Sequence, residues 1–472
     1  MLSVYNAVYE SLVTIDDDYL PQGCIAESWE ESSAGKYWTF HLRTDVRFSD
    51  GTPLTAADVV ASANYILDKA RDENIIDHGW YANLNYFVKS ISAKDDYTVV
   101  VTAKSGKKDF RTYYGILYQM TFPIVPAAQV AMDNPLGSGP YVVSQFLAGD
   151  FMTLEANPAW WKTQPYVRQI MISFHDIPKA VIDSYEYNRV DAVFTRSTAG
   201  AQYKTGTLSV SMQYRTSQLE CLLTSNTASE LTPEVRRAIR YVIDRQKIIS
   251  NVYSGMAVLT NFPFYPGTWM YNDSLDSLFT INLDEARRLL EAAGWEDSDE
   301  NGVLDRVNAE GNLRELSLRF YVYEEPDNDV RLEAANMIAE QLAQVGIACS
   351  VEAMTLANVQ EKLKAGSFDL ALIAFSMDVA PDPGFMLIKG NTGNYNRYKS
   401  DKMTELCHDL RREVSQEGYR QKLMQIQALF AEDCPFMCLY YRTGNVITRY
   451  MYTTCRDVRE YELLRGIESF SP

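Results

Sequence analysis

The chain has 472 residues, of which 46% are hydrophobic, and its 62 acidic and 44 basic side chains give a formal net charge of −18. This length exceeds what one hydrophobic core usually supports, so we expect two or three domains. The acidic balance disfavours nucleic acid and anionic membrane surfaces as partners, because phosphate groups are bound through Lys and Arg.

Short strand-like runs alternate with helical patterns along the whole chain, which is typical of α/β or α+β folds. Near-alternating apolar residues at 39–48 predict a strand, and the dipeptide Asp50-Gly51 predicts the turn after it. Thr55 and Asp58 have the spacing of a helix N-cap and a first-turn carboxylate. This stretch therefore predicts a strand, a turn and a capped helix, and its role is structural rather than catalytic.

Later segments predict further strands and helices. Strands are expected at 95–104, 137–146 and 368–375, the last nearly all apolar as in a central buried strand. Thr232 and Pro233 predict the start of a helix over 231–253, with its buried face at Val235, Ala238, Ile239, Val242 and Ile243. Gly294 and Gly346 are expected to end two more helices, and a last long helix is expected near 402–429.

Two residue patterns were weighed as metal sites. Cys434 and Cys438 form a C-x3-C pair, but no second pair or nearby His completes it, so the seven scattered cysteines are expected to be buried free thiols. In DSDENGVLDRVN (297–308), five residues match the first, third, fifth, sixth and ninth positions of a calcium loop. Asn308 stands where a bidentate Glu is needed, so an Asp/Gly-rich turn is the favoured interpretation and no metal or cofactor is predicted.

Enzyme signatures are missing from the sequence. The four histidines are far apart in the sequence, and neither an HExxH spacing nor a GxSxG, GxGxxG or Walker-type loop is found. A pair of carboxylates that hydrolyses glycosidic bonds stays an open alternative, because two such residues can be far apart in the sequence and close in the fold. No apolar run is long enough to span a bilayer, and no basic-then-apolar signal opens the chain. We therefore expect either a cytoplasmic protein or one whose export signal is not part of this sequence.

A set of motifs in fixed order identifies a family. AESWEESSAGKYWTFHLRTDVRFSDGTPLTAADVV (26–60) resembles the signature of family 5 extracellular solute-binding proteins, the dipeptide, oligopeptide and nickel receptors of ABC importers. GSGPY, NPAWW, TPEVRRAIRYVIDRQKII, DEARRLLEAAGW, AANMIAEQLAQVGI, GSFDLALIAF and DPGF follow in the order of that family. The matching motifs run from about residue 8 to residue 445.

The resemblance implies an α/β fold, a two-lobed periplasmic-binding-protein-like clamp of type II with an extra N-terminal α+β subdomain. Lobe I would take residues 1–20, 138–215 and 441–472, the extra subdomain 21–137, and lobe II 216–440. A ligand would be captured between the lobes. The family begins earlier, with a lipoprotein signal and a first strand that this sequence does not include.

The resemblance also implies binding residues. Peptide-binding members carry a Trp-x-x-Asp stretch after the buried strand, and here Phe375, Ser376, Met377 and Asp378 occupy that place. Asp378 would accept the α-ammonium of the peptide, because a buried ammonium needs a paired carboxylate. Asp382 is the nearest alternative.

Other ligand-binding positions of the family correspond less exactly to residues of this sequence. Arg331 lies near where dipeptide binders place an arginine, whereas Leu372 stands where an oligopeptide binder can carry one for the ligand carboxylate. Trp80 and Tyr81 fall where the extra subdomain offers an aromatic side chain, and Tyr440 and Tyr441 fall near another ligand-facing strand.

The sequence therefore predicts a monomeric, lipid-anchored, extracytoplasmic receptor that delivers a short peptide to an ABC permease and is not an enzyme. An oligosaccharide, an opine or a metal chelate is the alternative cargo within the same fold, although the scarcity and placement of His disfavour a nickel receptor. A secreted hydrolase is the remaining alternative from another class.

Overall fold

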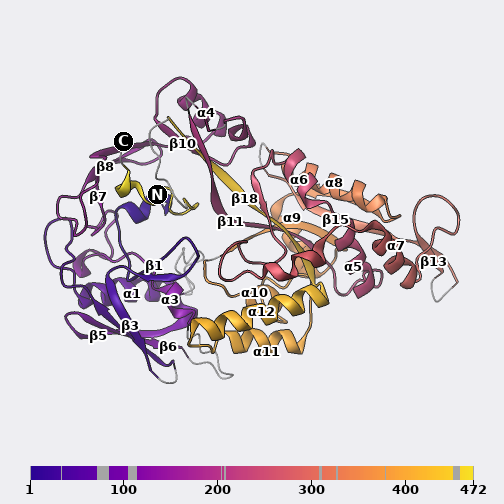
Figure 1. The fold of residues 1–472 in the computed structure, drawn as a ribbon, viewed down its shortest axis with the longest axis horizontal. Helices are drawn as coiled ribbons and strands as arrows, with labels where there is room; N and C mark the ends of the chain where they lie inside the picture. Colours follow the sequence, from indigo (N-terminus) through magenta and orange to yellow (C-terminus); the bar gives the residue numbers. More distant parts are fainter. Residues whose placement is uncertain are drawn as a thin grey trace. The chain divides into compact units, whose positions relative to one another are not determined.

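The computed structural model describes residues 2–32, 35–71, 84–104, 114–203, 205–206, 209–307, 311–325, 328–377, 379–449 and 458–470. The chain folds into two compact units (Figure 1). Unit 1 comprises Met1–Thr216, His408–Tyr419 and Thr443–Pro472, and unit 2 comprises Ser217–Cys407 and Arg420–Arg442. The three-part division into two lobes and a subdomain stays a prediction. Among the described residues, no helix is both long and apolar enough to cross a membrane.

The N-terminal part of unit 1 contains a four-stranded antiparallel sheet in the order β3-β4-β6-β5. Its strands are β3 (Ala26–Glu31), β4 (Tyr37–Leu42), β5 (Val88–Asp95) and β6 (Thr98–Ala103). Helix α1 (Ala56–Arg71) packs on β5 and β6 through side chains at helical spacing, among them Val59, Ala63 and Leu67. The other short elements between residues 2 and 129 are η1 (Leu2–Ala7), β1 (Val13–Ile15), β2 (Pro21–Gly23), α2 (Leu84–Phe87), α3 (Ile116–Gln119) and η2 (Ala127–Gln129).

The predicted turn and helix cap in this region are confirmed. Gly51 adopts a positive φ of 87°, and the Thr52 amide donates to the Asp50 carboxylate at 2.9 Å. The amide of Thr55 donates to the Asp58 carboxylate at 2.9 Å, which is the reciprocal bond of a capping box. The stretch around DGTPLTAADVV is thus a strand connection followed by a capped helix.

A second sheet in unit 1 brings the two ends of the chain into one hydrophobic core. Its three antiparallel strands are β7 (Tyr141–Leu147), β8 (Phe151–Ala156) and β9 (Gln169–Ser173). Side chains from both termini pack with Tyr141 and Leu154, including Val8 and Phe470. The remaining elements of unit 1 are α4 (Pro178–Glu186), β10 (Ala192–Thr195), η3 (Thr198–Gln202) and η5 (Ile467–Ser469).

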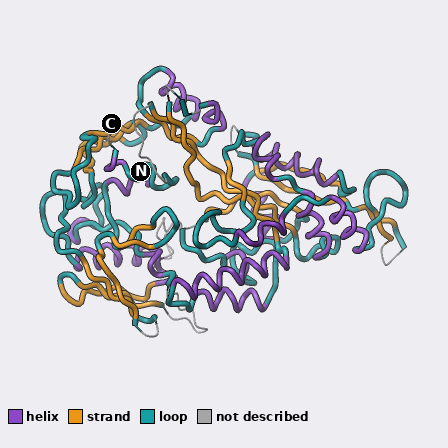
Figure 2. The backbone as a smooth tube through the Cα atoms, in the orientation of Figure 1, coloured by secondary structure: helices purple, strands orange, loops and turns teal. Residues whose placement is uncertain are grey.

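The largest sheet has the strand order β10-β18-β11-β17-β15-β16, with β12 also paired to β18. Its further strands are β11 (Val210–Thr224), β12 (Ala257–Leu259), β15 (Ser317–Tyr323), β16 (Ala348–Met354), β17 (Leu370–Ser376) and β18 (Phe436–Thr448). β15 is parallel to both β16 and β17, whereas β11 is antiparallel to β17. The long strands β11 and β18 each run from one unit into the other (Figure 2). β17 lies between two strands and is almost entirely buried, as its apolar sequence predicts.

Helices cover the sheet in unit 2 and enclose its core. They are α5 (Pro233–Val242), α6 (Arg245–Asn251), α7 (Leu283–Ala292), α8 (Val330–Ala343), α9 (Leu356–Ala365), α10 (Gly384–Leu387) and the 3-10 helix η4 (Asp273–Phe279). α11 (Asp401–Leu410) and α12 (Gln416–Asp433) each have residues in both units, and β13 (Asp305–Val307) pairs with β14 (Leu313–Glu315). The five apolar residues predicted for the buried face of 231–253 all lie in the core.

Two predicted helices are each divided in the structure. The Thr232 hydroxyl caps α5 as expected, but the chain leaves the helix at Ile243, and the Asp244 carboxylate accepts the Lys247 amide at 2.9 Å to start α6. The single helix expected at 402–429 is likewise α11 and α12, because the Ser415 hydroxyl accepts the Gly418 amide at 3.1 Å and caps a new helix start. A capping side chain inside an apolar pattern explains both breaks.

Three buried arginines join α5 and α6 to the end of α12 and to β18. Arg240 donates to the carbonyl of Ala431 at 2.7 Å, and Arg236 donates to the carbonyl of Cys434 at 3.3 Å. These acceptors lie in or just after the last turn of α12, where backbone carbonyls lack helical partners and the helix dipole favours cations. Arg245 donates to the carbonyl of Cys438, and burial lowers the pKa of its guanidinium to about 10.

The six described cysteines are free thiols. Five of them, including Cys434 and Cys438, are buried, and Cys349 is half-buried. The prediction of buried free thiols agrees with five of these positions, and Cys349 is free but only half-buried.

A buried carboxylate in unit 1, that of Glu10, accepts several hydrogen bonds. Glu10 accepts hydrogen bonds from the indole N–H groups of Trp160 and Trp161 at 3.2 and 2.7 Å, and from the Ser138 hydroxyl at 3.1 Å. Burial is the largest effect and raises the pKa of Glu10 above its usual 4.5, although these hydrogen bonds and Lys162 oppose the shift. Glu10 therefore binds a proton more tightly in the folded chain than in the unfolded chain.

This raised pKa predicts a pH dependence of stability. The contribution of Glu10 is complete below its unfolded pKa of 4.5 and is lost as the pH rises through the higher folded pKa. We expect the free energy of unfolding of the wild type, relative to that of Glu10→Gln, to fall as the pH rises above 4.5. Denaturant unfolding of both proteins over a pH series measures this difference, and a difference that stays constant or rises would contradict the assignment.

Candidate functional site

Several strands of unit 2 end at the same edge of the large sheet. The parallel strands β15 and β17 end there at Tyr323 and Ser376, and the antiparallel strand β11 enters unit 2 there at Ser217. The carboxyl ends of parallel strands are the usual location of ligand sites in open α/β sheets. We name this edge the strand-end site and define it by Ser217, Gln218, Glu325, Arg331, Ser376, Met377 and Arg442.

Hydroxyl and backbone groups from β11 and β17 form one part of the strand-end site. The hydroxyl oxygens of Ser217 and Ser376 lie 3.3 Å apart, and the Met377 amide donates to the Ser217 carbonyl at 2.8 Å. Ser376 is exposed, and Met377 is half-buried. Two of the residues predicted to bind ligand, Ser376 and Met377, therefore lie in this part of the site, and Ser376 presents an exposed hydroxyl group.

A buried charge network forms the other part of the site. Arg331, whose side chain is wholly buried, donates from Nη2 and Nε to the two carboxylate oxygens of Glu220 at 2.6 and 3.2 Å. Its Nη1 donates to Glu325, which also accepts from Arg442 Nη1 at 2.8 Å. Two guanidinium groups and two carboxylates thus balance each other, and the Gln218 side chain, also on β11, donates to Glu220 at 3.2 Å.

The network keeps Arg331 charged in spite of its burial. Burial alone would lower the pKa of Arg331, but the carboxylate of Glu220 and, to a smaller extent, Glu325 outweigh it and raise the pKa above its usual value. The guanidinium also lies 3.8 Å from the ring centre of Tyr323, a cation–π contact that stabilises it further. Within this structure the donors of Arg331 are therefore engaged by the protein itself.

The predicted aromatic residues are packed in the interior of unit 2. Tyr440 is fully buried, and its ring centre lies 5.0 Å from that of Tyr253. Phe375 is 7% exposed and packs against Phe385 and Tyr395, at ring distances of 5.8 and 6.3 Å. Both side chains support the strand-end site from within unit 2.

Three of the eight residues predicted to bind ligand are not described by the structure. Asp378, Trp80 and Tyr81 lie outside the described residues. The binding roles of all eight predicted residues stay predictions, although the structure places Arg331, Ser376 and Met377 at one edge of the sheet and Tyr440 in the core beneath it.

Sequence reasoning missed Glu220, Glu325, Arg442 and Tyr253. One signal for Glu220 was present in the sequence, because it is an acidic residue within the otherwise apolar run LECLL (219–223), and a carboxylate in a buried strand needs a cationic partner. The identity of that partner was not accessible, because Arg331 is 111 residues away in the chain.

The segment weighed as a calcium loop forms a hydrogen-bonded turn. The carboxylates of Asp297, Asp299 and Asp305 lie within 4.8 Å of one another. Asp297 accepts the amides of Asn301 and Gly302 at 3.0 Å each, and Asp305 accepts the Ser298 amide at 2.9 Å. The Asp/Gly-rich turn predicted as the favoured alternative accounts for these bonds.

Comparison with known proteins supports a family assignment. The sequence model of the bacterial extracellular solute-binding proteins, family 5 Middle, matches residues 21–397. The oligopeptide-binding protein AppA of Bacillus subtilis is 26% identical over 97% of this chain and 86% of its own length. The nickel-binding periplasmic protein of Escherichia coli is 26% identical over 61% of this chain and 56% of its own length.

Solved structures show the same fold. The structure of NikA from Brucella suis in complex with Fe(III)-EDTA has a TM-score of 0.82 at 19% identity, over 100% of this chain and 95% of that chain. The structure of AppA from B. subtilis in complex with a nonapeptide has a TM-score of 0.68 at 23% identity, over 99% and 94%. The predicted fold class, an α/β fold of the type II periplasmic-binding-protein kind, is confirmed.

The charge network predicts a large effect of removing one partner. Glu220→Gln leaves the buried charge of Arg331 without its bidentate carboxylate, so we expect a loss of about 3–5 kcal/mol in the free energy of unfolding. Denaturant unfolding measures this loss. The matched control is Glu285→Gln, which removes the partner of Arg288 in an exposed ion pair and should change stability little. Equal effects of the two variants would show that the network does not hold unit 2 together.

Proposed function

The chain belongs to the bacterial extracellular solute-binding proteins of family 5, and on this premise we propose that it is the substrate-binding receptor of an ABC importer and captures a short peptide. The observation that carries the peptide assignment is the match to an oligopeptide-binding relative over 97% of the chain. Members of this family are solute-binding receptors, so the protein makes and breaks no bond in this function. We further propose that it is lipid-anchored outside the cytoplasm and delivers its cargo to a membrane permease.

The geometry of the strand-end site supports a peptide as cargo. Peptides bind at sheets through their backbone amides and carbonyls, which need hydrogen-bonding groups at the end or edge of a strand. The exposed Ser376 hydroxyl provides such a group at the carboxyl end of β17. The neighbouring charge network is neutral as a whole, so it favours neither a cationic nor an anionic cargo.

We propose that Asp378 binds the α-ammonium group of the peptide. It is the next residue in the sequence after Met377, whose amide donates to the Ser217 carbonyl at 2.8 Å in the strand-end site. An ammonium group removed from water requires a carboxylate partner. We expect Arg331 to affect the cargo only through Glu325, whose side chain is 17% exposed. Arg331 and its other carboxylate partner, Glu220, are both fully buried.

Ligand binding would shift the receptor toward the conformation that the permease recognises. A ligand can shift such an equilibrium only by its difference in affinity for the two conformations. A metal chelate is the second candidate cargo, because one relative is a nickel-binding protein, but that similarity covers only 61% of this chain.

A thermal-shift screen tests the proposed function. Di- to pentapeptides, oligosaccharides and nickel chelates are compared, since a ligand that binds only the folded state raises stability by about 2.7 kcal/mol at a hundredfold excess over Kd. We expect stabilisation by peptides. Stabilisation by sugars or chelates alone would keep the receptor function and overturn the peptide assignment.

The ammonium anchor predicts a specific loss of affinity. Asp378→Ala should weaken peptide binding by about 2–5 kcal/mol, the usual result of truncating one partner of a buried charge pair, which is roughly 30-fold or more. Calorimetry with a peptide and its N-acetylated form measures the effect.

Acetylation should weaken binding to the wild type but not to Asp378→Ala, because the variant has already lost the contact. Asp382→Ala is the control, since the Asp382 carboxylate accepts the Gly384 amide at 2.8 Å and so has a local structural role. Unchanged affinity in Asp378→Ala, or a larger loss in Asp382→Ala, would reject Asp378 as the anchor.

A further inference from the structure

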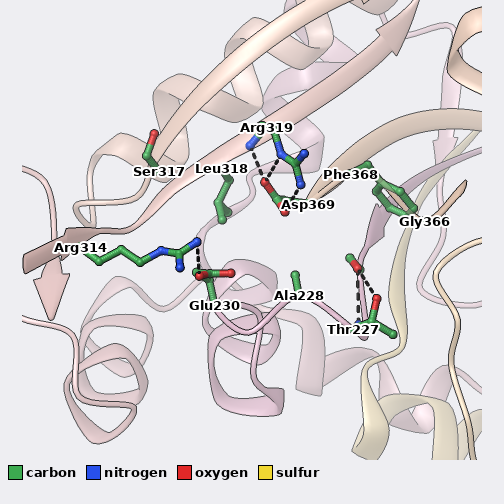
Figure 3. Close-up of a pocket in the computed structure, with 11 residues that line it drawn as sticks. Thr227, Ala228, Glu230, Arg314, Ser317, Leu318, Arg319, Gly366, Phe368 and Asp369 are labelled. Carbon is green, nitrogen blue, oxygen red and sulfur yellow. Dashed lines mark hydrogen bonds and ion pairs between the residues drawn. The ribbon is translucent and has the colours of Figure 1, made fainter. Parts of the chain in front are cut away.

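A cavity of about 310 Å³ lies at the other edge of the large sheet in unit 2, where β11 ends and β15 and β17 begin (Figure 3). Four charged side chains line it, Glu230, Arg314, Arg319 and Asp369. We name it the four-charge cavity after these residues. Its volume lies within the usual range of small-molecule sites.

The charged side chains of the four-charge cavity form two ion pairs. Arg314 Nη2 lies 2.7 Å from Glu230 Oε1. Arg319 donates from Nε and Nη2 to the two carboxylate oxygens of Asp369 at 3.0 and 3.1 Å, and its backbone amide donates to the same carboxylate at 2.9 Å. The carboxylate side chains are only 12% and 13% exposed, whereas both arginine side chains are more than half exposed.

The pairs leave hydrogen-bonding capacity of both kinds. Within the described part of the chain, Glu230 Oε2 accepts no hydrogen bond, and Arg319 Nη1 and Arg314 Nη1 donate none. This differs from the charge network at the strand-end site, where Arg331 bonds through all three of its nitrogens. The cavity wall therefore has an unused anionic acceptor and unused cationic donors, while its formal charge is zero.

Neutral groups complete the wall. The hydroxyls of Ser225 and Thr227 lie 3.2 Å apart, and the buried side chains of Leu318 and Phe368 also line the cavity. Small-molecule sites are usually lined mainly by apolar side chains with a few polar groups, so this mostly polar wall favours a small, strongly polar ligand.

We propose that the four-charge cavity is a second binding site, for a small zwitterion that carries an ammonium and a carboxylate group, such as a free α-amino acid. A simple anion placed here would face two carboxylates, and a simple cation would face two guanidinium groups. A zwitterion can direct its ammonium to Glu230 and its carboxylate to the free guanidinium donors. This inference does not depend on the peptide assignment, because the cavity lies at the opposite edge of the sheet from the strand-end site.

Saturation-transfer NMR on the whole protein tests the proposal with three probes of similar size, L-alanine, propionate and ethylammonium. We expect transfer to L-alanine that exceeds transfer to either singly charged probe. Equal or weaker transfer to L-alanine would overturn the proposal. Repeating the experiment with Asp378→Ala separates the two sites, since loss of the L-alanine signal in that variant would assign the signal to the cargo site and also overturn the proposal.

Two variants test whether L-alanine binds in the four-charge cavity. Glu230→Gln/Arg314→Gln removes one ion pair as a unit and leaves no lone charge, and Ser317→Trp fills the cavity from an exposed strand position without removing either pair. Each should weaken L-alanine binding at least about tenfold, equivalent to 1.4 kcal/mol.

The matched control is Glu285→Gln/Arg288→Gln, which removes an exposed ion pair on α7. It should leave L-alanine binding unchanged. Binding that persists in Ser317→Trp, or that weakens equally in the control, would overturn the proposal even if the other double variant fails to fold.

Discussion

The bidentate ion pair between Glu220 and Arg331 is the interaction on which unit 2 depends. Both side chains are fully removed from solvent, which costs several kcal/mol per charge unless geometry and additional hydrogen bonds compensate. Here the compensation comes from Glu325 and from the ring of Tyr323. The network thereby joins β11, the segment after β15, the start of α8 and, through Arg442, strand β18. It fixes the strand ends beside which the exposed Ser376 hydroxyl lies.

Buried arginines also explain why one recognisable motif is architectural. In TPEVRRAIRYVIDR, Arg236 and Arg240 donate to backbone carbonyls at the end of α12, and Arg245 donates to a carbonyl of β18. These contacts join segments about 190 residues apart, and two of them satisfy carbonyls at the end of α12 that lack helical partners. In this structure the three arginines of the motif therefore have a structural role, because they join α5 and α6 to α12 and β18.

Local chemistry was predictable from the sequence, and long-range pairing was not. The Asp50-Gly51 turn, the Thr232 cap and the buried strand β17 follow from residues next to one another. The breaks at Asp244 and Ser415 were also local, but a continuous apolar pattern hid them. Within the candidate site, the sequence predicted that Ser376 and Met377 lie at a strand end. The family resemblance also implied a binding role for Arg331. It did not place Tyr440 in the core or pair Arg331 with Glu220, because such contacts depend on which strands become neighbours in the sheet.

The two edges of the large sheet in unit 2 show that charge alone does not distinguish a structural network from a binding site. Each edge has two arginines and two carboxylates with no net charge. At the strand-end site each guanidinium nitrogen of Arg331 bonds to a carboxylate, and burial excludes water, so the group stabilises the fold. At the four-charge cavity the arginines are more than half exposed and retain unused donors. Residual hydrogen-bonding capacity beside an open cavity is the property that favours a ligand, because the ligand can then satisfy groups that the protein leaves unpaired.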